Sequence, residues 1–278
     1  MKSLNTYINE KMVYTKATAS KYKYHPETKE ELQELLDQLI KERGNDGNFN
    51  DIDTSQITDM SDLFYGMKKF NGDISEWDVS NVKNMKKMFY NCYEFNQPLN
   101  DWDVSNVKNM CYMFYECESF NQPLNAWDVS NVTNMYCMFD FCESFNQPLD
   151  KWDVSNVTDM QYMFNECRCF NQPLNNWDVS KVTTMGLMFR SCVSFNQPLN
   201  DWDVPNVTSM HGMFCYCESF NQSLNDWDVS NVKVMAYMFE GCKSFNQDIS
   251  KWDVSNVKYN KDMFNKCPIE EKYKPKFK

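Results

Sequence analysis

Apolar and polar positions recur along the chain with a fixed spacing of 25 residues. The pair Phe-Asn begins at Phe70 and returns at every twenty-fifth position as far as Phe245. All eight tryptophans and eight of the twelve cysteines keep the same spacing, each set in its own column. The columns are Trp77, Trp102, Trp127, Trp152, Trp177, Trp202, Trp227 and Trp252, and Cys92, Cys117, Cys142, Cys167, Cys192, Cys217, Cys242 and Cys267. Because the phase is never broken, we predict an array of coils, each burying its apolar face against the next.

The pattern inside one coil predicts two short elements. Leu99, Trp102 and Val104 have the L-x-x-L-x-L spacing of leucine-rich repeats, and residues two apart share one face of a strand. From Val107 to Cys117 the apolar positions are three or four apart, which favours a short helix or 3-10 segment. We therefore predict a leucine-rich-repeat-like α/β solenoid with one short parallel strand and one short helix or 3-10 segment in each 25-residue coil.

A capping helix is predicted before the first coil, within residues 25–48. Its apolar positions recur at the spacing of one helix face, and Thr28 and Glu31 have the spacing of a capping box. Gly44 suits the position that follows a helix. The apolar face consists of Leu32, Leu35, Leu36, Leu39 and Ile40.

The repeat boundaries divide the chain into four parts. We expect a basic N-terminal extension at 1–24, the capping helix at 25–48, nine coils at 49–268 and a basic C-terminal tail at 269–278. No second helix is predicted after Cys267, so we expect the last coil to be poorly sealed or covered by another chain.

Charge and composition exclude several classes of protein. The net charge of -11 argues against nucleic-acid binding, which needs a basic face. No apolar run approaches the ~20 residues that span a bilayer, and the first residues lack the apolar core of a signal peptide. We therefore expect a cytoplasmic protein, in a host cell or a virion if its origin is viral, with its cysteines reduced.

An aspartate follows every tryptophan of the repeat and forms an acidic column. If like residues lie above like, neighbouring carboxylates repel each other unless something offsets their charge. One interpretation is hydrogen bonding to the serine and backbone N–H groups just downstream; the other is a stripe that binds cations or a basic ligand. The column consists of Asp78, Asp103, Asp128, Asp153, Asp178, Asp203, Asp228 and Asp253.

The cysteine column has two interpretations, an inert ladder of buried thiols or a disulfide or metal site. The pairs Cys167-x-Cys169 and Cys215-x-Cys217 do not have the usual zinc-ligand spacing. The two histidines, His25 and His211, have no nucleophile beside them, and no phosphate-binding loop or nucleophile elbow occurs. We expect no enzymatic activity, no cofactor and no metal site.

Variable positions between the fixed methionines and phenylalanines carry many large side chains. Varied aromatic residues on a rigid scaffold are typical of a recognition surface. The alternative is an ordinary wall on which each ring packs against the neighbouring coil. The candidate partner-binding residues are Tyr90, Tyr112, Tyr115, Tyr136, Phe141, Tyr162, Leu187, Tyr216 and Tyr237.

The unit FNQPLNDWDVSNVKNMCYMFYECES resembles the BspA-like leucine-rich repeats and related repeats of bacterial surface lipoproteins. At least a dozen columns agree in each unit, over about residues 49–268. Similar repeats with the cysteine are frequent in giant DNA viruses of amoebae. The resemblance implies a leucine-rich-repeat-like solenoid used for surface or protein contact.

Two functions follow from these observations. The first is a non-enzymatic repeat scaffold that binds a host or assembly protein. The alternative is a structural component that dimerises or stacks through the edge of its last coil.

Overall fold

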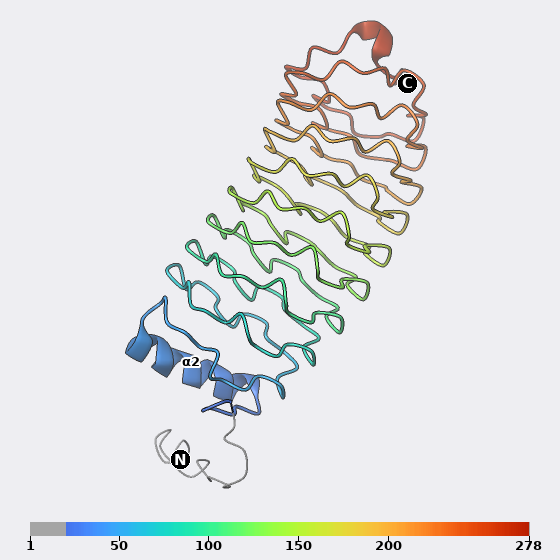
Figure 1. Ribbon diagram of the computed structural model, residues 1–278. Helices are drawn as coiled ribbons and strands as arrows, with labels where there is room; N and C mark the ends of the chain where they lie inside the picture. The colour runs from blue at the N-terminus through green and yellow to red at the C-terminus, as the bar shows by residue number, and fades with distance from the viewer. Residues whose placement is uncertain (1–20, 278) are drawn as a thin grey trace.

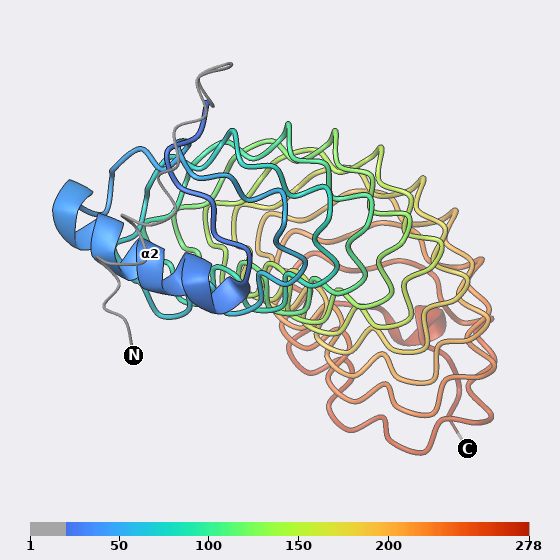
Figure 2. The same ribbon diagram turned by 90° about the horizontal axis from the view of Figure 1, so that it is seen from below.

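The computed structural model describes residues 21–277, in which successive coils of the chain stack along one direction (Figures 1 and 2). Parallel backbone bridges join positions 25 residues apart, so the coils are in register. One continuous series of these bridges joins Asp59, Asn84, Asn109, Asn134, Asp159, Thr184, Ser209, Val234 and Tyr259. Like side chains therefore lie above like along the stack.

Helix α2 (Lys29–Arg43) lies across the N-terminal end of the stack (Figure 1). Thr28 is its N-cap and accepts a hydrogen bond from the Glu31 N–H at 3.2 Å, as the capping-box spacing predicts. Gly44 ends the helix with φ 80°, a conformation that costs glycine little. The buried face consists of Leu32, Leu35, Leu36 and Leu39. The helix thus occupies the middle of the predicted 25–48 segment and removes the apolar end of the first coil from water.

One side of each coil, residues 109–117 and their equivalents, forms what we call the ladder wall. Every second N–H on this wall donates to a carbonyl of the next coil. The remaining N–H groups close turns within the coil; the Met113 N–H, for example, donates to the Met110 carbonyl at 3.1 Å. The bonds that leave one coil are Met110 to Asn134, Tyr112 to Tyr136, Phe114 to Met138 and Glu116 to Asp140, at 2.8 to 3.2 Å.

These turns replace the short helix or 3-10 segment expected in each coil. Half of the N–H groups point along the stack and so cannot make bonds inside a helix. Tyr112 and Glu116 also have φ of 58° and 56°, outside the right-handed helical region. Within residues 21–277 the 3-10 helix is η1 (Glu271–Tyr273), which follows the last coil.

The side that carries tryptophan and aspartate, residues 99–107 and their equivalents, we call the tryptophan wall. The expected strand at Trp102 to Val104 makes no bridge; the parallel bridge of this coil lies at Asn109. On this wall, side chains make many of the hydrogen bonds between neighbouring coils. The Trp127 Nε1–H donates to the Leu99 carbonyl at 2.8 Å, and the Asn131 amide donates to the Ser105 carbonyl at 2.8 Å. On this wall, side chains rather than a backbone ladder reach across to the preceding coil.

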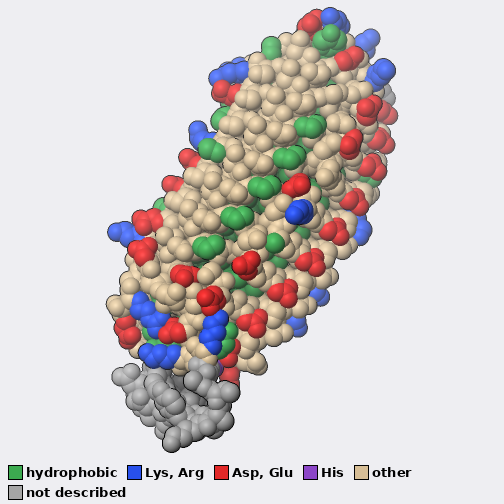
Figure 3. All heavy atoms as spheres, viewed as in Figure 1, with side chains coloured by type: hydrophobic (Ala, Val, Ile, Leu, Met, Phe, Trp, Pro, Cys, Tyr) green, Lys and Arg blue, Asp and Glu red, His purple; other side chains and the backbone are tan. Residues whose placement is uncertain are grey.

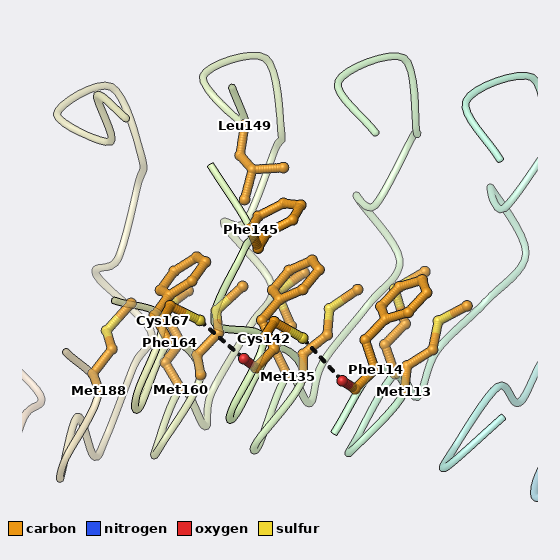
Figure 4. Close-up of a cluster of buried hydrophobic side chains, with 14 of the residues drawn as sticks. Met113, Phe114, Met135, Cys142, Phe145, Leu149, Met160, Phe164, Cys167 and Met188 are labelled. Carbon is orange, nitrogen blue, oxygen red and sulfur yellow. Dashed lines mark hydrogen bonds between the residues drawn. The ribbon is translucent and has the colours of Figure 1, made fainter. Parts of the chain in front are cut away.

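Columns of stacked aromatic rings fill the space between the two walls. The rings of Phe114 and Phe139 lie 5.6 Å apart and nearly parallel, and those of Phe120 and Phe145 lie 6.0 Å apart. Methionines and the cysteine column pack beside them (Figure 4). Aromatic pairs contribute about 0.5–1.5 kcal/mol beyond their buried area, so the repetition itself stabilises the stack.

The segment after Cys267 packs on the last coil, which is better sealed than the sequence predicts. Ile269 is buried, and the Ile249 N–H donates to the Tyr273 carbonyl at 3.0 Å. Tyr273 and Phe277 pack against the core. Isolated apolar residues of this segment, with no helical periodicity, cover the interior of the last coil.

Candidate functional site: an aromatic ridge on the ladder wall

Three tyrosines 25 residues apart stack on the outer side of the ladder wall. The rings of Tyr65 and Tyr90 lie 4.7 Å apart, and those of Tyr90 and Tyr115 lie 4.5 Å apart, both pairs nearly parallel. The backbone bonds fix the distance between coils. A tyrosine at the same position of successive coils therefore gives a continuous stack of rings. The side chains are therefore held in place before any partner arrives.

A second row of aromatic residues runs beside this stack. Tyr112 and Tyr136 meet edge to face at 5.1 Å, and Tyr136 meets Tyr162 in the same way at 5.8 Å. Tyr112 also contacts Tyr115, at 5.8 Å, which joins the two rows. We call the connected set the aromatic ridge; it consists of Tyr65, Tyr90, Tyr112, Tyr115, Tyr136, Phe141 and Tyr162.

Part of the ridge stands on left-handed backbone. Tyr112, Phe141 and Tyr162 have φ of 58°, 60° and 57°. This conformation costs a residue with a side chain about 1–2 kcal/mol. Strain of this kind persists only where the surrounding structure imposes it, and here the bonds between coils do so. Leu187, Tyr216 and Tyr237 share this conformation, so it belongs to these positions of the repeat and is not particular to the ridge.

Three of the predicted residues lie outside the ridge. Tyr216 packs over Gly241, where an added Cβ would lie 2.4 Å from its ring. Leu187 covers Gly212 in the same manner, and Tyr237 meets His211 edge to face at 5.6 Å. For these three the structure favours the alternative of local packing between neighbouring coils.

Two members of this surface were missed in the sequence. Tyr65 is the most exposed tyrosine of the ridge, at 51%. The Lys87 ammonium lies 5.7, 5.4 and 5.5 Å from the ring centres of Tyr65, Tyr90 and Tyr112, within the range of cation–π attraction. The 25-residue spacing from Tyr90 leads directly to Tyr65, whereas the position of Lys87 among the rings depends on its side-chain conformation.

Five tyrosines of the ridge, Tyr90, Tyr112, Tyr115, Tyr136 and Tyr162, have a raised pKa. Burial is the largest cause of a raised pKa at Tyr90, Tyr115 and Tyr136. These three hydroxyls therefore keep their protons, and some already bond within the protein, as Tyr115 does with Glu116. A surface that combines flat rings with O–H donors suits contact with a protein.

The tyrosine stack ends where its column changes to polar residues. Asp140 follows Tyr115 in that column, is 4% exposed, and accepts a hydrogen bond from the Asn165 amide at 2.7 Å. Burial raises the pKa of Asp140 to about 7. Beside it, Glu166 forms ion pairs with Arg168 and Arg190, both at 2.9 Å. The sequence analysis did not identify this buried polar cluster, although Asp140, Asn165 and Arg190 continue the column of Tyr115 at the same 25-residue spacing.

The aspartate column has the local hydrogen bonds of the first interpretation. The Asp103 carboxylate accepts from the Ser105 N–H at 3.1 Å and from its hydroxyl at 2.6 Å. The serine hydroxyl bond is the main cause of a lowered pKa at Asp103, and Asp178 and Asp228 follow the same pattern. Asp203 is the exception, because Pro205 has no N–H to donate. These bonds stabilise the turn, and Figure 3 shows acidic side chains recurring along the stack.

The cysteine column consists of free thiols that bond to the preceding coil. Cys142 Sγ donates to the Phe114 carbonyl at 2.9 Å (Figure 4). Burial raises the pKa of the Cys142 thiol well above its usual value, so the thiolate needed for metal binding or nucleophilic attack is disfavoured. In residues 21–277 no three His, Cys, Asp or Glu side chains form a group suited to a metal ion.

Comparison with known families shows to which family the chain belongs. Residues 32–149, 124–214 and 197–272 match the family described as Mycoplasma protein of unknown function, DUF285. The chain belongs to this repeat family, which confirms the repeat character predicted from its sequence. A comparison with curated proteins gives no match. Among the described residues, no helix combines the length and the apolar character needed to cross a membrane.

Proposed function

We propose that the protein is a non-enzymatic repeat scaffold that binds a protein partner through the aromatic ridge. The observation that carries this proposal is the unbroken ring contact from Tyr65 to Tyr162 on the outer side of a rigid wall. Aromatic side chains that are fixed in advance contribute binding energy at low entropic cost. Lys87 supplies a cation within the same surface.

We also propose that the fold belongs with the leucine-rich-repeat-like solenoids of the BspA-like group, with turns and isolated bridges in place of the strand and helix of each coil. The 25-residue coil, the parallel bridges and the helix across the first coil support this placement. Twelve free cysteines support a reducing compartment such as the cytoplasm.

The ridge is tested by removing its exposed rings and comparing the bound proteins. In the variant Tyr65→Ser/Tyr90→Ser the exposed end of the stack is lost, while the ladder bonds are made by backbone and stay in place. The matched control is Tyr237→Ser, which removes a ring outside the ridge. A photo-crosslinking residue at Lys68, three residues after Tyr65 in the chain, identifies the partner in each case.

The proposal requires a protein that crosslinks to the native chain and to the control but not to the ridge variant. A partner retained equally by all three proteins would show that binding occurs elsewhere.

A second candidate is self-assembly through the last coil, by dimerisation or stacking. It is supported by backbone groups at that edge which have no partner within residues 21–277. Light scattering over a concentration series tests it: a constant monomer mass excludes this candidate.

A further inference from the structure

The bonds between coils on the ladder wall all run in the same direction. The peptide unit between Asn109 and Met110 shows the pattern. Its carbonyl accepts from the Met85 N–H of the preceding coil, and its N–H donates to the Asn134 carbonyl of the next. Four peptide units per coil are aligned in this way at every junction from the coil of Met60 to the coil of Met235.

Aligned peptide units leave N–H groups at one end and carbonyl groups at the other. In the last coil, the N–H groups of Asn260, Asp262, Phe264 and Lys266 stand where every earlier coil has donors to its neighbour. No acceptor for them is present in residues 21–277. We call the segment 258–266 the donor edge. It has four N–H groups without an acceptor in the described chain, at the positions where every earlier coil of the ladder donates to the next.

The donor edge is electropositive for two independent reasons. Each peptide dipole of about 3.5 D points its positive end toward the N–H, so the aligned units add up toward the last coil. Other rows of bonds, outside the ladder wall, run the opposite way, for example from the Lys258 N–H to the Lys233 carbonyl and from the Ser219 N–H to the Val193 carbonyl, so the aligned dipoles act locally, at the ladder wall. In addition, Lys258, Lys261 and Lys266 are exposed on the edge, with Asp262 as its one acidic residue. In Figure 3 basic side chains surround the C-terminal end of the stack.

Cations normally stabilise the carbonyl end of aligned peptides, as at the C-terminus of a helix. Here lysines lie at the N–H end, where they add to the positive potential. Tyr259, at the bridge position, is the most exposed large hydrophobic residue of the described chain, at 64%. The fixed methionine of the column is replaced by Asn260. The edge therefore presents donors, cations and one exposed ring together.

We propose that the donor edge binds an extended acidic segment of another protein, whose backbone carbonyls accept the four N–H groups and whose carboxylates meet the lysines. This is strand addition in which the edge acts only as donor. The proposal concerns a surface separate from the aromatic ridge and does not depend on it.

A second copy of the chain fits the donor edge less well. In a symmetric pair, N–H groups would face N–H groups and the three lysines would face their own copies. In a head-to-tail stack the edge would meet the carbonyl end of the first coil, but α2 lies across that end of the stack (Figure 1), and its Lys29 side chain donates to the Ser61 hydroxyl at 2.7 Å. Lysine on an edge strand is a common protection against pairing with an identical chain.

Binding of fluorescein-labelled decaglutamate, followed by anisotropy at constant ionic strength, tests the charge requirement. The edge variant is Lys258→Glu/Lys261→Glu/Lys266→Glu. The matched control, Lys83→Glu/Lys108→Glu/Lys151→Glu, makes the same change in net charge at exposed lysines elsewhere on the stack. We expect the edge variant to bind at least about tenfold more weakly than the native protein, and the control to stay within about twofold of it. Equal weakening in both variants would overturn the proposal, since it would mean non-specific attraction.

Hydrogen exchange with and without decaglutamate tests the backbone contribution. The amides of Asn260, Asp262, Phe264 and Lys266 should exchange rapidly in the free protein and become protected when the peptide binds. Binding without this protection would overturn strand addition. Protection that rises with protein concentration alone would instead assign the edge to self-assembly, and equal affinity for oligothymidylate would assign it to polyanions in general. Either result would refute an acidic protein segment as the occupant.

Discussion

The two walls of the stack are held together by different chemical groups, and their sequences differ accordingly. On the ladder wall the backbone makes the bonds between coils, so side chains such as Tyr112 and Leu187 vary freely in one column. On the tryptophan wall side chains make many of these bonds, through the indole of Trp127 and the amide of Asn131. There the same residue types return in nearly every coil. The aromatic ridge lies on the ladder wall, where side chains are not needed for the bonds between coils.

The largest expected effect comes from deleting a tryptophan. Trp152→Ala removes a buried indole, its stack with Trp127 at 6.3 Å and its bond to the Leu124 carbonyl at 2.9 Å. We expect a loss of about 4 kcal/mol in the free energy of unfolding, as for other large-to-small core changes. Urea denaturation followed by tyrosine and tryptophan fluorescence measures it.

The matched change on the ladder wall is Tyr162→Gly. It loses a ring contact but relieves left-handed backbone, so we expect a net change within about 1 kcal/mol. If both variants lost a similar amount of unfolding free energy, the side chains of the two walls would contribute equally to stability, which would contradict this comparison.

The next effect depends on pH and tests a buried charge on the ladder wall. Burial raises the pKa of Asp140 to about 7, above its unfolded value near 3.8. The folded state therefore holds the proton more tightly, and stability falls as the pH rises from about 4 to about 7. Asp140→Asn should remove this decline and raise stability at pH 8 by about 2 kcal/mol.

Thermal unfolding across that pH range compares the Asp140→Asn protein with the native one. Asp128→Asn, on the exposed tryptophan wall, serves as control and should leave the decline in place. A native protein whose stability does not fall between pH 4 and 7 would refute the prediction.

A smaller effect is expected from the cysteine column. Cys142→Ala removes the thiol that donates to the Phe114 carbonyl and leaves a small cavity. We expect a loss of about 1–2 kcal/mol, measured by urea denaturation. Cys169→Ala is the control, because that thiol is exposed and lies outside the column. Destabilisation by Cys169→Ala as large as that by Cys142→Ala would contradict the role given to the buried bond.

The smallest expected effect comes from removing a serine hydroxyl that bonds to the aspartate column. Ser105→Ala removes the hydroxyl that bonds to Asp103 at 2.6 Å, so the lowered pKa of Asp103 should move back toward its usual value. The cost in stability should be a few tenths of a kcal/mol, because the carboxylate is exposed (~0.2–1 kcal/mol for such contacts). Carboxyl titration by NMR measures the pKa, and an unchanged Asp103 titration would exclude the hydroxyl as the cause.

Much of the interior was predictable from single residues. Trp102, Met110 and Cys117 are each buried where their columns require it, because burial of an apolar side chain repeats with the coil. Tyr65 was predictable in the same way from its spacing to Tyr90. The stacking of Asp140, Asn165 and Arg190 follows from the same spacing. The ion pairs of Glu166 with Arg168 and Arg190 were not predictable, since they join different columns and depend on side-chain conformation.

The sequence by itself determined the 25-residue coil, its register and the identity of the inward-facing columns, because a periodic apolar pattern permits only one way to hide those side chains from water. Only the tertiary structure decided which wall has its peptide units aligned along the stack. Backbone N–H and carbonyl groups are the same in every residue, so their direction is set by the turns between coils and by the tryptophan, asparagine and cysteine side chains that occupy the competing acceptors. The aromatic ridge and the donor edge both arise from that alignment.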